Sequence, residues 1–168
     1  IGRLIRENHC GEFPLFYLDS HWRDYWPLKG EVRKIVKGCP RAVVIVDDFQ
    51  VPNREQFKYM ARRRISGGRY VELDIHGRDQ PLALSGGRAS TNDGDDANVE
   101  VCGLDLLQPL LDANCFYDFL FPNYSAADAY PEGSDHPLTG YMVLFQNLEN
   151  PSRAVLSDEF VQRYFTHE

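Results

Sequence analysis

Apolar residues in this chain are grouped into short runs that alternate with polar segments. The run FPLFYLDSHW over residues 13–22 is apolar on both faces apart from one aspartate, which is typical of a strand buried in a parallel sheet. Residues 25–39 then place apolar side chains at helical spacing and predict an amphipathic helix that stops near Gly38. RAVVIVDDF over 41–49 is rich in β-branched residues and predicts a second strand. Together these elements predict a βαβ unit with parallel strands.

The second half of the chain carries weaker patterns. LDLLQPLLDA over 104–113 predicts a helix that is kinked or restarted at Pro109. Two further apolar runs, CFYDFLF (115–121) and GYMVLFQN (140–147), predict strands. A final helix is predicted over 156–165. The order of these elements predicts one α/β domain over the whole chain.

Residues 51–103 differ from their surroundings and are interpreted as a long insertion in this domain. Within it, YVELDIH (70–76) alternates between apolar and polar positions and predicts an exposed strand of an inserted hairpin. The triplet at 62–64 is arginine throughout, and given the net negative charge we interpret it as a solvated helix face, with binding of a phosphate or an acidic substrate group as the alternative. The polar stretch TNDGDDAN (91–98) lacks the spacing of a calcium-binding loop and is interpreted as a mobile acidic loop.

Composition and charge narrow the classes of partner. Hydrophobic residues make up 43% of the chain and charged residues 26%, as in globular domains rather than unfolded chains. The formal net charge of -7 argues against duplex nucleic acid or an anionic membrane as a partner, because either would require a basic face. No apolar run reaches the roughly 18 to 20 residues of a membrane span, and no signal-peptide pattern opens the chain. A small molecule is therefore the expected partner.

The four cysteines have no paired spacing and are interpreted as reduced thiols rather than a zinc site or a disulfide framework. Together with the missing signal-peptide pattern, they suggest a cytoplasmic protein. Because the sequence begins at Ile1 and its first strand comes only after about a dozen residues, we also expect a piece of a longer protein.

Acidic residues stand at the carboxyl ends of both predicted parallel strands. Asp19 interrupts the end of the first strand, and Asp47 and Asp48 end the second. Ligands bind outside this edge of a parallel α/β sheet, and neighbouring strands are only about 4.8 Å apart, so we expect three carboxylates in one small volume. Their mutual repulsion favours a cation, and an all-oxygen cluster suits Mg²⁺, with Mn²⁺ or Ca²⁺ as alternatives. The alternative interpretation is that aspartates end these strands only by capping the next turn.

Histidine and aromatic residues surround these acids in the sequence. His21 is a candidate general base or a packing surface for a flat ligand, and Trp22 or Tyr25 could stack on a cofactor ring. Trp26 follows Tyr25, and Phe49 follows Asp48. With Tyr25 they are candidates for substrate contacts. The alternative is a loop histidine bonded to the backbone, with aromatics that cover the sheet edge. The sequence contains no GxSxG, no Walker loop and no HExxH, so hydrolase and P-loop functions lack support.

The segments LFYLDSHWRDYWPL (15–28) and AVVIVDDFQVP (42–52) together resemble the second half of a class I S-adenosylmethionine-dependent methyltransferase. In particular they are similar to metal-dependent O-methyltransferases of the catechol and macrocin types. The resemblance implies a partial Rossmann-like sheet, a βαβ unit followed by a C-terminal antiparallel strand pair, with a long insertion. It also implies that Asp19, Asp47 and Asp48 bind Mg²⁺.

The resemblance assigns roles to further residues as well. It implies that Asp19 and His21 are catalytic, with His21 as the base. His21 and Trp22 would contact the cofactor S-adenosylmethionine, and Tyr25, Trp26 and Phe49 would contact the substrate. The catechol enzymes read Asp-His-Trp where this chain reads Asp19-Ser20-His21-Trp22, so an extra residue separates the aspartate from the histidine.

The implied activity is Mg²⁺-assisted transfer of a methyl group from S-adenosylmethionine to a hydroxyl of a small molecule or a sugar. No glycine-rich GxGxG cofactor loop occurs in the chain, so the resemblance implies the C-terminal half of a larger enzyme. An isolated half would expose a sheet edge and associate with the missing N-terminal half or with a second copy. Two alternatives stay open: a non-catalytic Rossmann-like interaction module and a metal-dependent sugar-modifying enzyme.

Overall fold

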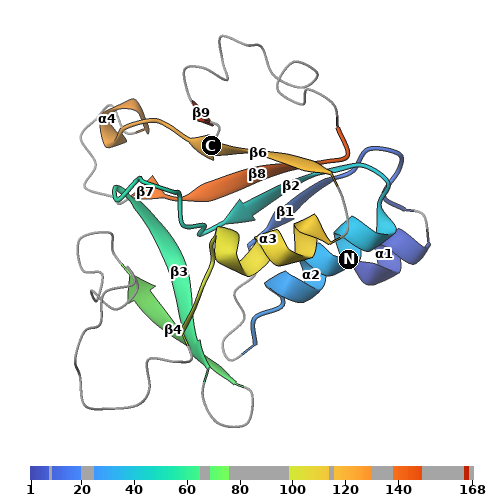
Figure 1. The fold of residues 1–168 in the computed structure, drawn as a ribbon, viewed down its shortest axis with the longest axis horizontal. Coiled ribbons are helices and arrows are strands. Elements are labelled where there is room, and N and C mark those ends of the chain that lie inside the picture. Colours follow the sequence, from blue (N-terminus) through green and yellow to red (C-terminus); the bar gives the residue numbers. More distant parts are fainter. Residues whose placement is uncertain are drawn as a thin grey trace.

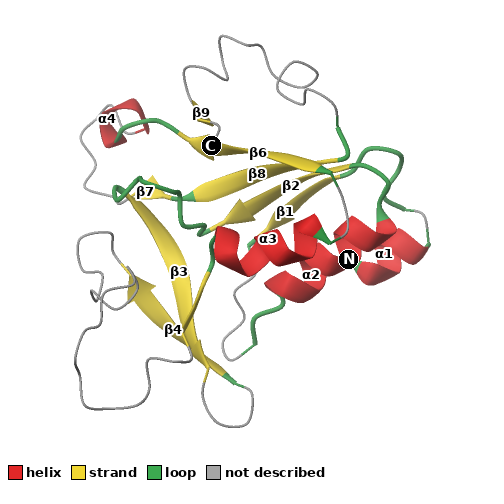
Figure 2. Cartoon of the chain, viewed as in Figure 1, coloured by secondary structure: helices red, strands yellow, loops and turns green. Residues whose placement is uncertain are grey.

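The computed structural model describes residues 1–7, 9–19, 25–64, 69–75, 99–113, 116–129, 138–148 and 165–166. The elements follow in the order α1 (Gly2–Arg6), β1 (Leu15–Leu18), α2 (Leu28–Gly38), β2 (Ala42–Asp47), β3 (Phe57–Arg64), β4 (Tyr70–Ile75), β5 (Val99–Val101), α3 (Leu104–Asp112), β6 (Tyr117–Pro122), α4 (Ala126–Ala129), β7 (Leu138–Thr139), β8 (Tyr141–Gln146) and β9 (Phe165–Thr166). Helices α1, α2 and α3 gather beside β1 and β2, and β3 and β4 lie on the other side of the view (Figures 1 and 2). The fold is therefore mixed α/β, as the sequence predicts.

The larger sheet has the strand order β1-β2-β8-β6-β9. Strands β1 and β2 are parallel, and Leu15 to Leu18 pair in register with Val43 to Val46. Strand β8 is antiparallel to both of its neighbours, β2 and β6. The parallel pairing across α2 agrees with the predicted strand–helix–strand unit, and the β6–β8 pairing agrees with the predicted antiparallel pair.

Helices α2 and α3 cover one face of the larger sheet. The apolar positions that predicted α2 are buried, and they pack in one core with Leu18 and Val46 of the strands and with Leu107 and Leu111 of α3. Gln146 of β8 is also buried, and its amide donates hydrogen bonds of 3.2 and 2.7 Å to the carbonyls of Val36 and Cys39. These bonds satisfy carbonyls that the end of α2 leaves without helical partners.

The structure tests one of the two helices predicted for the second half of the chain. Helix α3 is a single helix with Pro109 inside it, so the predicted restart at this proline is wrong. The predicted helix over 156–165 lies outside the described residues except for Phe165, which begins strand β9. In the part of the chain that the structure describes, no helix is long and apolar enough to cross a membrane.

The insertion at 51–103 supplies three strands of a second, mixed sheet, in the order β4-β3-β5 with antiparallel pairing. Strand β7, from outside the insertion, pairs with β3 in parallel. The predicted strand at 70–76 corresponds to β4, but β3 was not predicted. The interpretation of Arg62, Arg63 and Arg64 as a solvated helix face is wrong, because they lie on β3 and Arg62 is fully buried. Its guanidinium donates to the carbonyl of Tyr25 at 3.1 Å and lies 5.9 Å from the ring centroid of Trp26. These contacts allow a charged residue to be buried.

Candidate functional site

The acidic residues singled out in the sequence lie at one edge of the larger sheet. Asp19 directly follows β1, Asp47 ends β2, and Asp48 begins the turn after it. Because β1 and β2 are parallel and Leu18 pairs with Val46, Asp19 and Asp47 are the next positions along neighbouring strands. The structure therefore brings the two strand ends together as the sequence predicted.

Tyr17 links these acids. Its side chain stands on the same edge, 61% exposed, and its hydroxyl donates a hydrogen bond to Oδ2 of Asp47. That bond is the main reason why the pKa of Tyr17 is raised, with burial next. The negative charges of Asp47, Asp19 and Asp48 raise this pKa further, so all three carboxylates act on one phenol.

Sequence reasoning missed Tyr17. It lies two residues before Asp19, and the twofold repeat of a strand brings side chains at that spacing to the same face. The alternation of exposed and buried residues in β1 could therefore have singled it out.

The turn that carries Asp48 is anchored on both sides. Asp48 has a left-handed backbone with φ of 51°, and its amide donates to Oδ1 of Asp47 at 2.9 Å. Its carbonyl accepts the amide of Met60 in β3 at 2.8 Å. The next amide, that of Phe49, donates to the carbonyl of Gly140 at 2.8 Å. The acidic pair is thus held between the inserted sheet and the chain just before β8.

Cys102 contacts the backbone of the acidic pair, Asp47 and Asp48. It is buried, and its Sγ is 3.8 Å from the carbonyl oxygen of Asp47. Burial raises the pKa of this thiol, and the negative charges of Asp48 and Asp47 raise it further. The neutral thiol leaves carboxylate oxygen as the ligand type of this edge.

The aromatic candidates occupy different environments. Tyr25 is 65% exposed, as a ligand contact requires. Trp26 is buried next to Arg62, and Phe49 is fully buried with its ring 6.0 Å from that of Phe121. The structure thus places Trp26 and Phe49 in the core rather than at a surface that a substrate could reach, because both side chains fill the space between the sheets and the helices.

Two further predicted residues, His21 and Trp22, lie outside the described residues. Their predicted roles as base and cofactor contacts stay predictions.

The edge of the larger sheet that carries Asp19, Asp47 and Asp48, here called the acidic edge, has the ligand types that suit a metal ion, but its side chains lie too far apart to share one. Three carboxylates without a thiolate are the donors that Mg²⁺ prefers. Among the residues that the structure describes, however, no three His, Cys, Asp or Glu side chains are close enough to share an ion. Both carboxylate oxygens of Asp47 accept hydrogen bonds, from Tyr17 and from the amide of Asp48. Metal binding therefore requires the carboxylates to approach one another, and the Tyr17 hydroxyl competes with a cation for Oδ2 of Asp47.

We expect the substitution Tyr17→Phe to strengthen Mn²⁺ binding about fivefold, because it removes a donor worth about 1 kcal/mol that competes for Asp47. Titration calorimetry with MnCl₂ measures the change. Tyr25→Phe is the control, since it removes a phenol from another exposed ring. Weaker Mn²⁺ binding by Tyr17→Phe would show instead that the phenol orients the carboxylate.

Comparisons of the chain with protein-family models, curated proteins and solved structures found no significant match. The residues of the acidic edge and their geometry are therefore the basis for assigning a function.

Proposed function

We propose that this chain is the C-terminal half of an enzyme that transfers a methyl group from S-adenosylmethionine to a hydroxyl of a small molecule or sugar, assisted by Mg²⁺. One observation carries the proposal. Asp19 directly follows β1, and Asp47 and Asp48 lie at the end of the neighbouring parallel strand β2, where the Tyr17 hydroxyl donates to Asp47. Such an edge is where α/β sheets bind their ligands.

The topology supports the same proposal. A partial Rossmann-like sheet requires a parallel βαβ unit, and the resemblance adds a C-terminal antiparallel pair. The pairing of β1 with β2 and of β6 with β8 agrees with both requirements. The second sheet between β2 and α3 corresponds to the long insertion.

Each group has a distinct part in the proposed reaction. A bound Mg²⁺ supplies a Lewis acid that lowers the pKa of the acceptor hydroxyl. Asp19, Asp47 and Asp48 would hold the ion, and the backbone hydrogen bonds of Asp48 and Phe49 fix the turn that carries Asp48. His21 is the proposed base and, with Trp22, a cofactor contact, while exposed Tyr25 contacts the acceptor. Because no glycine-rich loop occurs in the sequence, the proposal assigns most of the cofactor site to a preceding half.

The second candidate is a non-catalytic interaction module, and exposed apolar residues favour it. Strand β1 ends the larger sheet in the described part of the chain. Phe13, Leu15 and Tyr17 expose 47%, 65% and 61% of their surface there. An open strand edge with apolar side chains is a template for pairing with another chain.

Metal titration separates the two candidates. We expect the purified chain to bind Mg²⁺ or Mn²⁺ in titration calorimetry, and the double variant Asp47→Asn, Asp48→Asn to lose that binding while its circular dichroism is unchanged. The physical reason is that this change removes two of three anionic ligands. We expect S-adenosylmethionine not to bind this chain alone.

The matched control is Glu7→Gln, Glu12→Gln, which removes the same charge from two exposed positions in the first 12 residues. A wild-type chain that binds neither metal ion, or a double variant that binds as well as the wild type, would contradict the metal role and favour the interaction module.

A further inference from the structure

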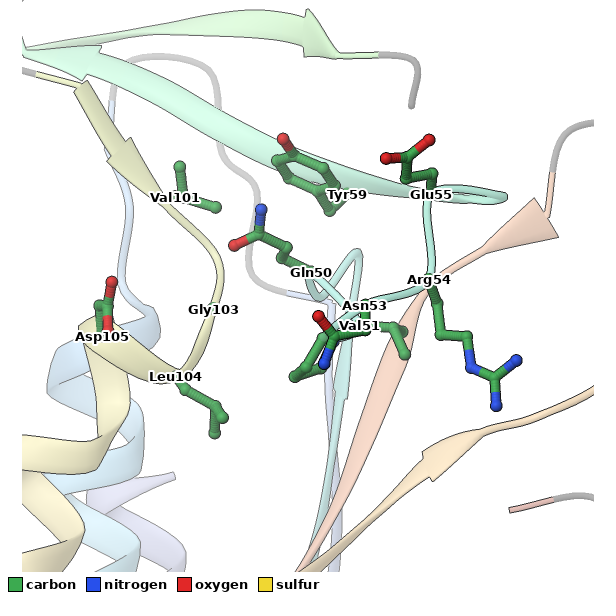
Figure 3. A pocket seen from close by; sticks show the side chains of 11 residues that line it. Gln50, Val51, Asn53, Arg54, Glu55, Tyr59, Val101, Gly103, Leu104 and Asp105 are labelled. Atoms are coloured by element: carbon green, nitrogen blue, oxygen red, sulfur yellow. The ribbon is translucent and has the colours of Figure 1, made fainter. Parts of the chain in front are cut away.

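A cavity of about 490 Å³ lies between the segment after β2, strand β3 and the start of α3. Its walls come from segments at both ends of the insertion, residues 50–55, 101 and 103–105, and from Tyr59 of β3 (Figure 3). This volume is in the range of small-molecule sites in proteins. The cavity therefore joins two segments that lie about 50 residues apart in the sequence.

A buried hydroxyl contributes to the wall of this cavity. Tyr59 is only 6% exposed, and its hydroxyl has no partner in good hydrogen-bond geometry among the described residues. Burial raises its pKa, and the nearby Gln50 side chain opposes part of that rise. A buried polar group without a well-placed partner is costly, and a ligand hydroxyl would relieve that cost.

The first turn of α3 forms the opposite wall. This helix begins after Gly103 without a side-chain cap, which leaves its first amides available to an acceptor. A Cβ at Gly103 would lie 3.2 Å from Oε1 of Gln50, so the absence of a side chain lets Gln50 approach the start of α3. Asp105 adds an exposed carboxylate on the same turn.

The charge and chemistry of these walls select the class of ligand. Figure 3 shows Arg54 directed away from Gln50 and Tyr59, and the lining also carries the two carboxylates of Glu55 and Asp105, so its formal charge is negative. A phosphate or carboxylate would meet this negative charge, whereas hydroxyl groups can both donate to Asp105 and exchange hydrogen bonds with the Gln50 amide. Val101 and Leu104 add apolar surface for a ring face.

We propose that this cavity binds a neutral pyranoside, with its hydroxyls on Gln50, Tyr59 and Asp105 and its ring face on the apolar wall. The inference rests on the proposed function, because the pyranoside would be the methyl acceptor of that reaction. The cavity is close to the acidic edge along the chain. Gln50 follows Asp48 by two residues, and Cys102, which precedes Gly103, contacts the carbonyl of Asp47.

Saturation-transfer NMR on the full chain tests the proposal with methyl α-D-glucopyranoside, methyl α-D-mannopyranoside and methyl α-L-rhamnopyranoside as probes, without metal or cofactor. We expect transfer to the ring protons of at least one glycoside. Asp105→Asn and Tyr59→Phe each remove one hydrogen-bonding group, so we expect each to weaken that binding about tenfold. Glu12→Gln, which removes an exposed carboxylate elsewhere, is expected to bind like the wild type.

Three results would overturn the assignment. They are the absence of transfer to any glycoside, glycoside binding by both cavity variants that equals binding by the wild type, and binding of catechol or glucose 6-phosphate that is stronger than binding of the glycosides. Asp105 is exposed, so its variant stays informative even where Tyr59→Phe fails to fold. Metal titration of the wild-type chain and of Asp47→Asn, Asp48→Asn, beside the glycoside titration, separates the two proposals. A wild-type chain that binds metal but no glycoside contradicts the pyranoside cavity alone. A wild-type chain that binds a glycoside but no metal contradicts the proposed function alone.

Discussion

Replacing Gly140 by alanine is expected to lower the free energy of unfolding by about 3–5 kcal/mol, from the combined cost of overpacking and of two disturbed hydrogen bonds. Gly140 connects β7 to β8 and makes two backbone hydrogen bonds. Its amide donates to the carbonyl of Lys58 at 2.8 Å, and its carbonyl accepts from the amide of Phe49 at 2.8 Å. A Cβ here would overlap with the carbonyl oxygen of Phe49 and lie 3.0 Å from Cγ2 of Val51. Backbone on both sides leaves the new methyl group no room.

The same substitution tests how the acidic edge is held. Phe49 follows Asp48, so a shift at Gly140 moves the turn that carries the acidic pair. Urea denaturation measures the stability, and calorimetry with MnCl₂ measures the site. Gly30→Ala is the matched control: nothing lies within 4 Å of its added Cβ in the first turn of α2, and it should stabilise the protein by up to about 1 kcal/mol. Equal stability of the two variants would show that the contacts around Gly140 relax without cost.

The second large effect is expected for Arg62→Ala, at about 3–5 kcal/mol of lost stability, because the change leaves a cavity in the core and removes the donor to the Tyr25 carbonyl. Arg62 is fully buried in β3, where its guanidinium donates to Tyr25 and lies over Trp26. These contacts connect the inserted sheet to the segment that leads into α2. Lys29 makes a parallel connection through an ion pair of 2.9 Å with Glu100.

Urea denaturation of two further variants defines the origin of this loss. Arg64→Ala removes an exposed arginine from the end of the same strand and is expected to change stability by no more than about 0.5 kcal/mol. Arg62→Met keeps much of the buried volume without the charge, so we expect it to recover part of the loss. If Arg62→Ala were as stable as Arg64→Ala, the buried guanidinium would contribute nothing to the junction of the two sheets.

Gly140 and Arg62 matter for the same reason. Neither belongs to the acidic edge, but each connects the inserted sheet to a segment that bears candidate site residues. Arg62 contacts Tyr25 and Trp26, and Gly140 holds the chain that follows Asp48. The insertion thus positions the acidic edge in addition to forming the proposed pyranoside cavity.

Local pattern was sufficient for the elements whose neighbours are close in the sequence. The apolar face of α2 and the β-branched run of β2 predicted a parallel strand pair, and this pairing places Asp19 beside Asp47. The reason is general: burial repeats every two residues in a strand and about every 3.6 in a helix, so one short segment carries the signal. The two later strands, β6 and β8, were recognisable in the same way.

The sequence by itself therefore determined the α/β class, the strand–helix–strand unit and the shared edge for three carboxylates. Only the tertiary structure decided that Arg62 is buried on a strand, that Trp26 and Phe49 are core residues, and that Tyr17 is bound to Asp47. It also decided that both ends of the insertion enclose a cavity with Tyr59. Such features depend on contacts between segments far apart in the chain. An arginine in the sequence does not indicate whether a carbonyl and an indole from another segment will surround it.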